Sequence, residues 1–161
     1  YKRQISNIPP TLDKEVDMVK LKCMQAWNRA CDFSIAELSS FNTCTDLTLR
    51  AQLVRNLLAL PTLIAKASPE RLRKPNVEWL LAASETAAEL RTNLYIARET
   101  NCLTSAVADG GIRESLRLSE LLHELIGELI RELPQEWKRE FGQPQRVRAP
   151  IDRPKMTESK R

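Results

Sequence analysis

Basic side chains are the residues of this chain whose type and position most clearly indicate a chemical role, namely contact with the phosphates of a nucleic acid. They form two clusters. One lies in and around a short turn between two apolar segments, and the other lies in the segment after Pro134. The candidate contacts are Lys66, Arg71, Arg73 and Lys74 in the first cluster, and Lys138, Arg139, Arg146 and Arg148 in the second. Because such contacts neutralise phosphates and do not read base edges, they predict binding of RNA or DNA with little sequence preference.

The placement of charge supports the same interpretation. From Gln135 onward there are eight Lys or Arg residues against four Asp or Glu residues, whereas the whole chain has 25 against 21. The formal charge of +4 therefore lies in residues 135–161, and the rest of the chain is neutral. The alternative is that this tail is only a solvated basic segment, which is a common use of charge runs.

Metal chemistry has little support in the sequence. The four cysteines show no CxxC spacing, and the one histidine, His123, lies among leucines. Zinc needs about four ligands at suitable spacing, so we expect no metal and no cofactor. The cysteines, expected to be ordinary buried or edge thiols of a reducing compartment, are Cys23, Cys31, Cys44 and Cys102.

Catalytic chemistry has no more support. Glutamates spaced by four residues, at 85 and 89 and at 120, 124 and 128, lack the paired Glu-x-x-His motifs of a di-metal bundle and predict a solvated face. There is no P-loop and no GxSxG motif, and a single histidine offers no credible triad. We therefore expect a protein that is not an enzyme.

Composition indicates one all-α domain. The chain has 161 residues, of which 42% are hydrophobic and only four are glycine, and this favours helices over hairpins. Aromatic residues make up 5%, too few to predict a base-stacking platform. No apolar run approaches the ~20 residues needed to cross a bilayer, and no signal peptide is visible. The expectation is a soluble cytoplasmic protein without a membrane partner.

Hydrophobic periodicity predicts four helices that would position the basic clusters. They run from about Leu12 to Leu38, Leu49 to Ala67, Asn76 to Thr100 and Ile112 to Leu133. N-caps are expected at Thr11 and at Asp46 or Thr45, and Gly110-Gly111 is the expected stop before the fourth helix. The chain thus divides into a loose N-terminus (1–11), a bundle (12–133) and a basic, proline-containing tail (134–161) with one helical turn around 136–141.

Three features of these helices bear on packing. The inward faces are expected to include Trp27 and Tyr95, and small residues at 84, 87 and 88 would let a neighbouring helix come close. The second helix is apolar around much of its circumference, so it is expected to touch more than its own core or to lie against another subunit. Pro61 removes the helical hydrogen bond to the carbonyl of Leu57, which either bends the helix for an interface or merely improves core packing.

An up-down-up-down bundle would bring the basic clusters together. In that topology the N-terminus, the connection between the second and third helices, and the C-terminus share one end. Lys2 and Arg3 would join the two clusters there, whereas residues 30–49 contain no Lys or Arg. The expected molecule is electrically polar, with one basic end.

Paired motifs in these helices give the chain a resemblance to a known family. The motif residues are Leu60-Pro61 with Ile64-Ala65, then Ala83-Ser84, Glu89-Leu90 and Ile96-Ala97, and finally Ile126-Gly127 with Leu129-Ile130. Over roughly 16–133 they resemble the four-helix-bundle family of rRNA intervening-sequence proteins and the accessory variability determinants of diversity-generating retroelements. The chain departs from the pattern at Lys66-Ala67, where the family often has an acidic residue and glycine.

The resemblance implies a ring-like homo-oligomer, with five subunits as the number the family implies, and no catalytic residues. It implies a non-catalytic nucleic-acid-binding accessory protein that assists a reverse transcriptase in a retroelement ribonucleoprotein. Two alternatives stay open. One is a protein-interaction scaffold, and the other is an rRNA intervening-sequence-encoded protein, in each case without direct nucleic-acid binding.

Overall fold

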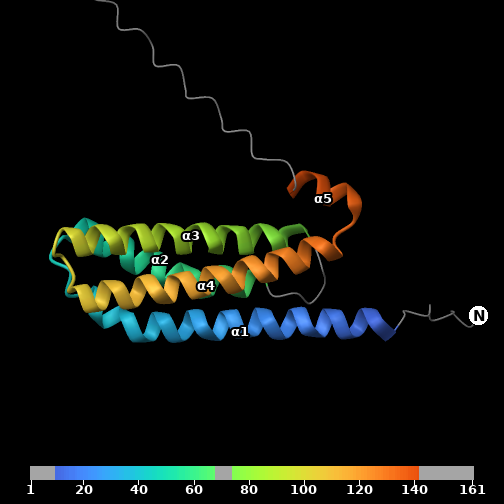
Figure 1. Cartoon of the computed structure of the whole chain (residues 1–161), viewed down its shortest axis with the longest axis horizontal. Coiled ribbons are helices and arrows are strands. Elements are labelled where there is room, and N and C mark those ends of the chain that lie inside the picture. The colour runs from blue at the N-terminus through green and yellow to red at the C-terminus, as the bar shows by residue number, and fades with distance from the viewer. Residues whose placement is uncertain (1–9, 68–73, 142–161) are drawn as a thin grey trace, which may run out of the picture.

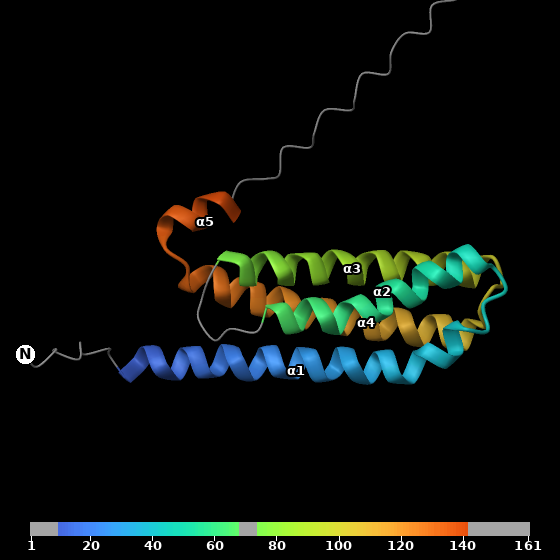
Figure 2. The ribbon, with the colours of Figure 1, turned by 180° about the vertical axis from the view of Figure 1, so that it is seen from behind.

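The protein is described from a computed structural model, which covers residues 10–67 and 74–141. This part of the chain contains only helices: α1 (Pro10–Phe41), α2 (Leu47–Lys66), α3 (Lys74–Glu99), α4 (Ser105–Glu132) and α5 (Gln135–Phe141). The four long helices run antiparallel to their neighbours as a bundle, and the short α5 follows α4 (Figures 1 and 2). The prediction of an all-α bundle is confirmed.

The bundle has two distinct ends. Each long helix packs against the next, α4 closes the arrangement against α1, and α5 contacts α4. At one end, which we call the α5 end, lie the start of α1, the end of α2, the start of α3 and the end of α4 (Figure 1). At the other, the loop end, lie the α1–α2 connection (42–46) and the α3–α4 connection (100–104). The end of α2, the start of α3 and α5 therefore lie at one end of the bundle (Figure 1), as the up-down-up-down topology predicts.

Helix α1 is longer than the sequence predicted at both of its ends. It begins at Pro10, so Thr11 lies inside the helix and is not its N-cap. Proline suits a first helical position because its fixed φ is already helical and the missing N–H needs no partner there. The helix then continues through Ser39 and Ser40 to Phe41, whose ring is fully buried in the core. Burial of that aromatic side chain outweighs the low helix propensity of the two serines.

Helix α2 is capped as predicted and carries its proline without a break. The Asp46 side chain accepts hydrogen bonds from the backbone N–H groups of Thr48 and Leu49, each at 2.9 Å. The Leu57 carbonyl, which Pro61 leaves without its helical donor, accepts a hydrogen bond from the Ser34 hydroxyl of α1 at 2.9 Å. The defect made by the proline is thus repaired by a neighbouring helix inside the core.

The prediction that Gly110-Gly111 stops the chain before the fourth helix is wrong. Helix α4 begins seven residues before Ile112, at Ser105, with Thr104 as its N-cap. Gly111 lies inside the helix, where a Cβ would come within 2.9 Å of a Leu94 methyl group. The glycine therefore serves close packing of α4 on α3 and does not end a helix.

Small residues hold α3 and α4 close together, as the sequence predicted. Ala87 is fully buried, and its carbonyl accepts a hydrogen bond from the Ser115 hydroxyl of α4 at 2.8 Å. A direct bond from a short serine side chain to another helix's backbone requires close approach of the two helices. Ser84 and Ala88 lie at the half-buried margins of the same face.

The core stripes match the predicted periodicity except at two aromatic residues. The residues buried along α4 include the predicted leucines and isoleucines at 118, 122, 125, 126 and 129. Trp27 lies largely on the surface, and Tyr95 is 53% exposed with the Arg98 guanidinium 4.3 Å from its ring centroid. The buried apolar positions of α3 are 77, 80, 83, 87, 90, 94 and 97, which step by three and four residues, so residue 95 falls on the outside.

Candidate nucleic-acid interface

Four of the eight predicted phosphate contacts lie in the described residues, and all four belong to elements of the α5 end. Lys66 ends α2 and Lys74 begins α3, while Lys138 and Arg139 lie in α5 (Figure 1). The other four, Arg71, Arg73, Arg146 and Arg148, lie outside the described residues.

Lys66 is exposed and its position is fixed by an aromatic ring. Its Nζ lies 4.5 Å from the centroid of the Trp79 ring in the second turn of α3. The ring face attracts the cation and leaves the rest of the ammonium group open to solvent. Trp79 was not a predicted site residue, although the antiparallel run of α2 and α3 places the second turn of α3 beside the last turn of α2.

Asn76 ties together the two helices on either side of the basic turn. Its side chain is buried, and its Nδ2 donates a hydrogen bond at 2.9 Å to the carbonyl of Ala67, the C-cap residue of α2. This bond fixes the residues that flank 68–73, the segment holding Arg71 and Arg73. No local sequence pattern indicates this bond, because the sequence predicts Asn76 only as the start of a helix.

Helix α5 adds two cations to the same end. Phe141 packs partly against the bundle core, which holds α5 near the start of α3 and the end of α4 (Figures 1 and 2). Lys138 is half-buried and Arg139 is exposed. Neither residue forms an ion pair within the part of the chain that the structure describes, so both are available to an external anion.

Several cations elsewhere in the bundle are paired with acidic residues of a neighbouring helix. Arg29 Nε lies 2.5 Å from Glu114 Oε1, joining α1 to α4. Arg98 Nη1 lies 2.7 Å from Asp109 Oδ1, and this contact raises the pKa of the arginine. Within the part of the chain that the structure describes, Lys138 and Arg139 lack such pairs, and so do the exposed Arg55 of α2 and Arg113 of α4. What distinguishes the α5 end is therefore the grouping of Lys66, Lys74, Lys138 and Arg139 on its elements.

The glutamates predicted to form a solvated face are exposed at 85, 89, 120 and 124, and Glu128 is the exception. Lys22 of α1 contacts Glu124 at 2.7 Å and Glu128 at 2.5 Å, and the Glu128 side chain is only 17% exposed. Hydrogen bonding to Glu124 and then Glu128 raises the pKa of Lys22, and the bond from Lys22 lowers the pKa of Glu124. Glu124 and Glu128 fasten α4 to α1.

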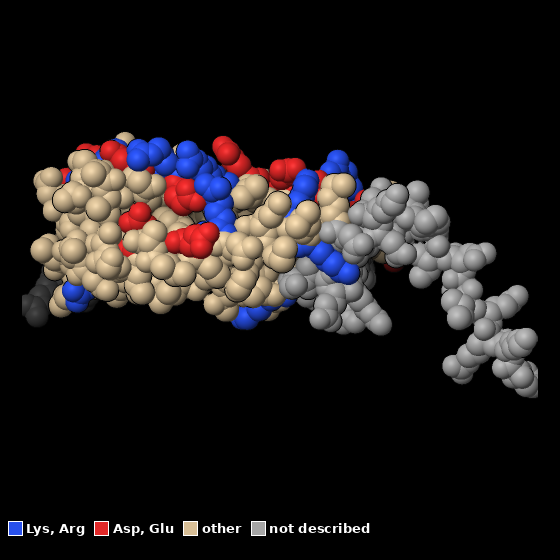
Figure 3. All heavy atoms as spheres, turned by 90° about the horizontal axis from the view of Figure 1, so that it is seen from below, with Lys and Arg blue, Asp and Glu red and all other residues tan. Residues whose placement is uncertain are grey.

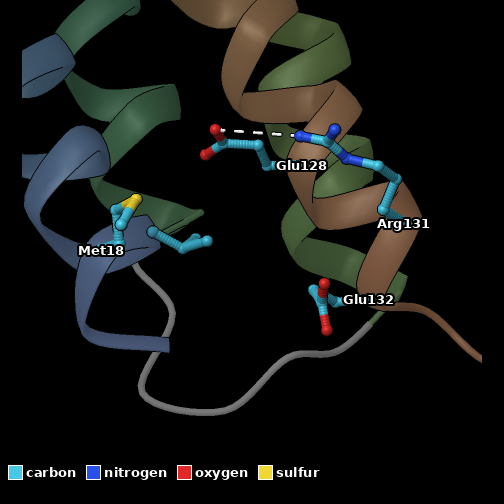
Figure 4. Close-up of a pocket in the computed structure, with 5 residues that line it drawn as sticks. Met18, Glu128, Arg131 and Glu132 are labelled. Atoms are coloured by element: carbon cyan, nitrogen blue, oxygen red, sulfur yellow. Dashed lines mark ion pairs between the residues drawn. The ribbon is translucent and has the colours of Figure 1, made fainter. Parts of the chain in front are cut away.

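A groove at the α5 end between α1 and α4 is chemically unsuited to phosphate. It has a volume of ≈ 380 Å³ and is lined by Met18, Val19, Glu128, Arg131 and Glu132 (Figure 4). Its one guanidinium lies 3.9 Å from Glu128 Oε1. A phosphate placed here would face two carboxylates, so an anion would favour the side of the end formed by α2, α3 and α5.

An uncharged surface covers the outer sides of α1 and α2. Exposed apolar side chains there include Ile35 (77% exposed) on α1, and Leu47 (67%) and Leu58 (46%) on α2. Seen from the α1 side, most of the described surface is uncharged, with many charged side chains along one margin and smaller groups of them within the uncharged area and at the opposite margin (Figure 3). The expectation that α2 is apolar beyond its core-facing stripe is therefore met at Leu47 and Leu58, whereas Val54 packs against the core.

Other site chemistries find little in the described residues. No group of three His, Cys, Asp or Glu residues there could hold a metal ion, and none of the helices is apolar enough over a sufficient length to cross a membrane. His123 Nε2 lies 3.3 Å from the Ser84 hydroxyl at the surface. This pair links α4 to α3.

Comparison with known proteins establishes the fold. No protein-family model matches the chain, and no curated protein matches its sequence. A solved structure of a protein with unknown function from the S23 ribosomal protein family of Bacteroides thetaiotaomicron is similar, with a TM-score of 0.61 and 16% sequence identity. The similarity covers 66% of this chain and 98% of that one. At this identity the two proteins share a helical fold, and nothing about activity follows.

Proposed function

We propose that this chain is a non-catalytic, oligomeric accessory protein that binds RNA or DNA through phosphate contacts and assists a reverse transcriptase in a retroelement ribonucleoprotein. The observation that carries the proposal is the set of cations at the α5 end, where Lys66, Lys138 and Arg139 form no ion pair within the described residues. The motif resemblance of the helices supplies the retroelement context, and the shared helical fold is compatible with it.

The chemistry of this end favours sequence-indifferent binding. Lysine and arginine side chains gain affinity for a polyanion by releasing its condensed counterions, whatever the bases are. The Trp79 ring beside Lys66 has that residue's ammonium group 4.5 Å from its centroid, which leaves this ring poorly placed to stack on bases. Selection of a particular template would then rest with the polymerase.

Self-association is the second part of the proposal. The outer apolar faces of α1 and α2 are the surface that a second copy would cover, because burial of exposed Ile35, Leu47 and Leu58 is favourable. A ring, for which the family resemblance implies five subunits, would repeat the α5 end around its axis and multiply the phosphate contacts.

Light scattering after size exclusion tests the assembly. The molar mass of the wild-type protein in solution is expected to be several times the 18.4 kDa of one protomer. The molar mass of the double variant Ile35→Glu/Leu58→Glu is expected to be close to that of one protomer. Leu116→Glu places the same charge at an exposed leucine of α4, outside this face, and is expected to leave the mass unchanged. A wild-type monomer would exclude this part of the proposal.

Nucleic-acid binding is tested by matched charge removal. The triple variant Lys66→Ala/Lys138→Ala/Arg139→Ala is expected to bind single-stranded RNA and DNA roughly ten-fold or more weakly at moderate salt. The control variant also removes three positive charges, by changing Arg55, Arg113 and Arg117 to alanine. Arg55 lies in the middle of α2, and Arg113 and Arg117 lie in the half of α4 nearer the loop end. Equal losses in the two variants would show that total charge, and not the α5 end, controls binding.

A scaffold function without nucleic-acid binding is the second candidate, and the extent of the uncharged α1–α2 surface favours it (Figure 3). An rRNA intervening-sequence-encoded protein of this kind would show no measurable affinity for RNA or DNA. Its assembly would still be lost in the Ile35→Glu/Leu58→Glu variant, so the two experiments together separate the candidates.

A further inference from the structure

Two cysteines that are far apart in the sequence meet at the loop end of the bundle. Cys44 lies in the α1–α2 connection and Cys102 in the α3–α4 connection, and the two thiols lie near enough for each to affect the pKa of the other. The Cys44 thiol donates to the Asp46 carbonyl at 3.6 Å, and the Asp46 backbone is also among the groups that lower the pKa of Cys102. All four cysteines of the chain are free thiols.

The other two thiols lie in different surroundings. Cys23 is buried in the core, where its sulfur lies 3.9 Å from the carbonyl of Ile64 in α2. Cys31 lines the groove between α1 and α2 beside Pro61. They therefore serve as internal controls for the pair at the loop end.

The paired thiols differ in access and in acidity. Cys102 is half-buried, and the Thr100 hydroxyl donates a hydrogen bond to its sulfur at 3.3 Å. This bond, with contacts from the Asp46 backbone, Thr45 and Cys44, lowers the pKa of Cys102. Cys44 is fully buried, and burial raises its pKa. An accessible acidic thiol beside a buried one is the arrangement of an attacking and a resolving cysteine.

We propose that Cys102 and Cys44 form a redox modification site whose substrate is a low-molecular-weight disulfide, and that its product is an intramolecular disulfide joining the two loops. The Cys102 thiolate attacks one sulfur of the external disulfide, forms a mixed disulfide and releases the first thiolate, which takes a proton. Cys44 then loses its proton to solvent, attacks the Cys102 sulfur and displaces the second thiolate, which is protonated. Two protein thiols are oxidised and one external disulfide is reduced to two thiols.

Closure of this bond would lock the loop end. The bond would close a loop of more than fifty residues, a length for which cross-linking restricts the unfolded chain strongly. For a chain of this size the expected rise in Tm is roughly 5 to 15 °C. The site lies at the end opposite Lys66 and α5, so it does not depend on the proposed nucleic-acid contacts.

Oxidised glutathione with the full chain is the direct test. Native protein is treated under mildly alkaline conditions, and intact mass and peptide mapping follow the products. The expected product has lost two hydrogens and contains a peptide pair linked through Cys44 and Cys102. The same linkage is expected in Cys23→Ser and Cys31→Ser. Cys44→Ser is expected to stop at a glutathione adduct on Cys102.

A second variant and a labelling experiment on wild-type protein test the proposal even if Cys44→Ser folds poorly. Cys102→Ser, at a half-buried position, is expected to abolish both the linkage and the rise in Tm caused by oxidised glutathione. In wild-type protein a limiting alkylating reagent is expected to label Cys102 first. The proposal is overturned if native wild-type protein accumulates only stable glutathione adducts, or if Cys31 enters disulfides as readily as the pair does.

Discussion

The hydrogen bond from Ser34 to the Leu57 carbonyl predicts a specific energetic coupling between two helices. Pro61 denies Leu57 its helical donor, and the Ser34 hydroxyl, which also lies 2.8 Å from the carbonyl of Ala30, replaces it at 2.9 Å. Both Ser34 and Leu57 are buried. Ser34→Ala should therefore leave a buried carbonyl unsatisfied, but only while Pro61 is present.

The magnitude follows from the fate of that carbonyl. In the wild-type background Ser34→Ala should cost about 1 to 3 kcal/mol, the usual penalty for an unsatisfied buried acceptor. In a Pro61→Ala background, the new backbone N–H at position 61 can donate to Leu57, so the same change should cost only about 0.5 to 1 kcal/mol. The expected coupling energy is on the order of 1 to 2 kcal/mol.

A double-mutant cycle measured by urea denaturation gives this coupling. Far-UV circular dichroism follows unfolding at one fixed protomer concentration, because self-association changes apparent stability. Thr92→Ala, which removes an exposed hydroxyl bonded to the Ala88 carbonyl of its own helix, is the control and should add to Pro61→Ala without coupling. If Ser34→Ala and Pro61→Ala are additive within about 0.5 kcal/mol, the repair of the proline defect by Ser34 is refuted.

Three other changes have definite expected outcomes. Gly110→Ala should stabilise the protein by about 0.5 to 1 kcal/mol, because no atom lies within 4 Å of the new Cβ in α4. The Cβ of Gly111→Ala would lie 2.9 Å from a Leu94 methyl group, so this variant should be at least about 1 kcal/mol less stable than Gly110→Ala in thermal unfolding. Lys22→Gln should lower stability at neutral pH, and its deficit should shrink as pH falls below the usual Glu pKa of 4.5, since the stabilisation from the lowered pKa of Glu124 is lost on protonation. A pH-independent deficit would contradict this pairing. Asn76→Ala should cost about 1 to 2 kcal/mol in urea denaturation, and an unchanged midpoint would show that its bond across the turn is dispensable.

Local signals predicted the elements well where the cause was local. Asp46 caps α2 because its side chain reaches N–H groups two and three residues ahead, a rule that the sequence displays directly. The leucine stripe of α4 likewise follows from helical periodicity alone. Gly111 was misread because its reason is Leu94 of another helix, and no local pattern contains that information. The same holds for the Ser34 bond that repairs Pro61.

The candidate site was predictable in type and only partly in detail. Clustered lysines and arginines indicated phosphate contact from the sequence, and the structure gathers Lys66, Lys74 and α5 at one end. The residues that hold this end, Asn76 and Trp79, escaped notice because their roles depend on the pairing of α2 with α3. The Lys22 contacts with the glutamates of α4 were missed for the same reason.

The salt dependence of nucleic-acid affinity tests the proposed function most directly. For wild-type protein, the logarithm of the binding constant for single-stranded RNA should fall linearly with the logarithm of salt between about 50 and 200 mM, with a slope of about −0.7 per phosphate contact. Replacing Arg71, Arg73 and Lys74 by alanine should reduce that slope by up to about 2 and weaken binding to RNA and DNA alike. Salt-insensitive binding by the wild type, or an unchanged slope in the variant, would contradict the account.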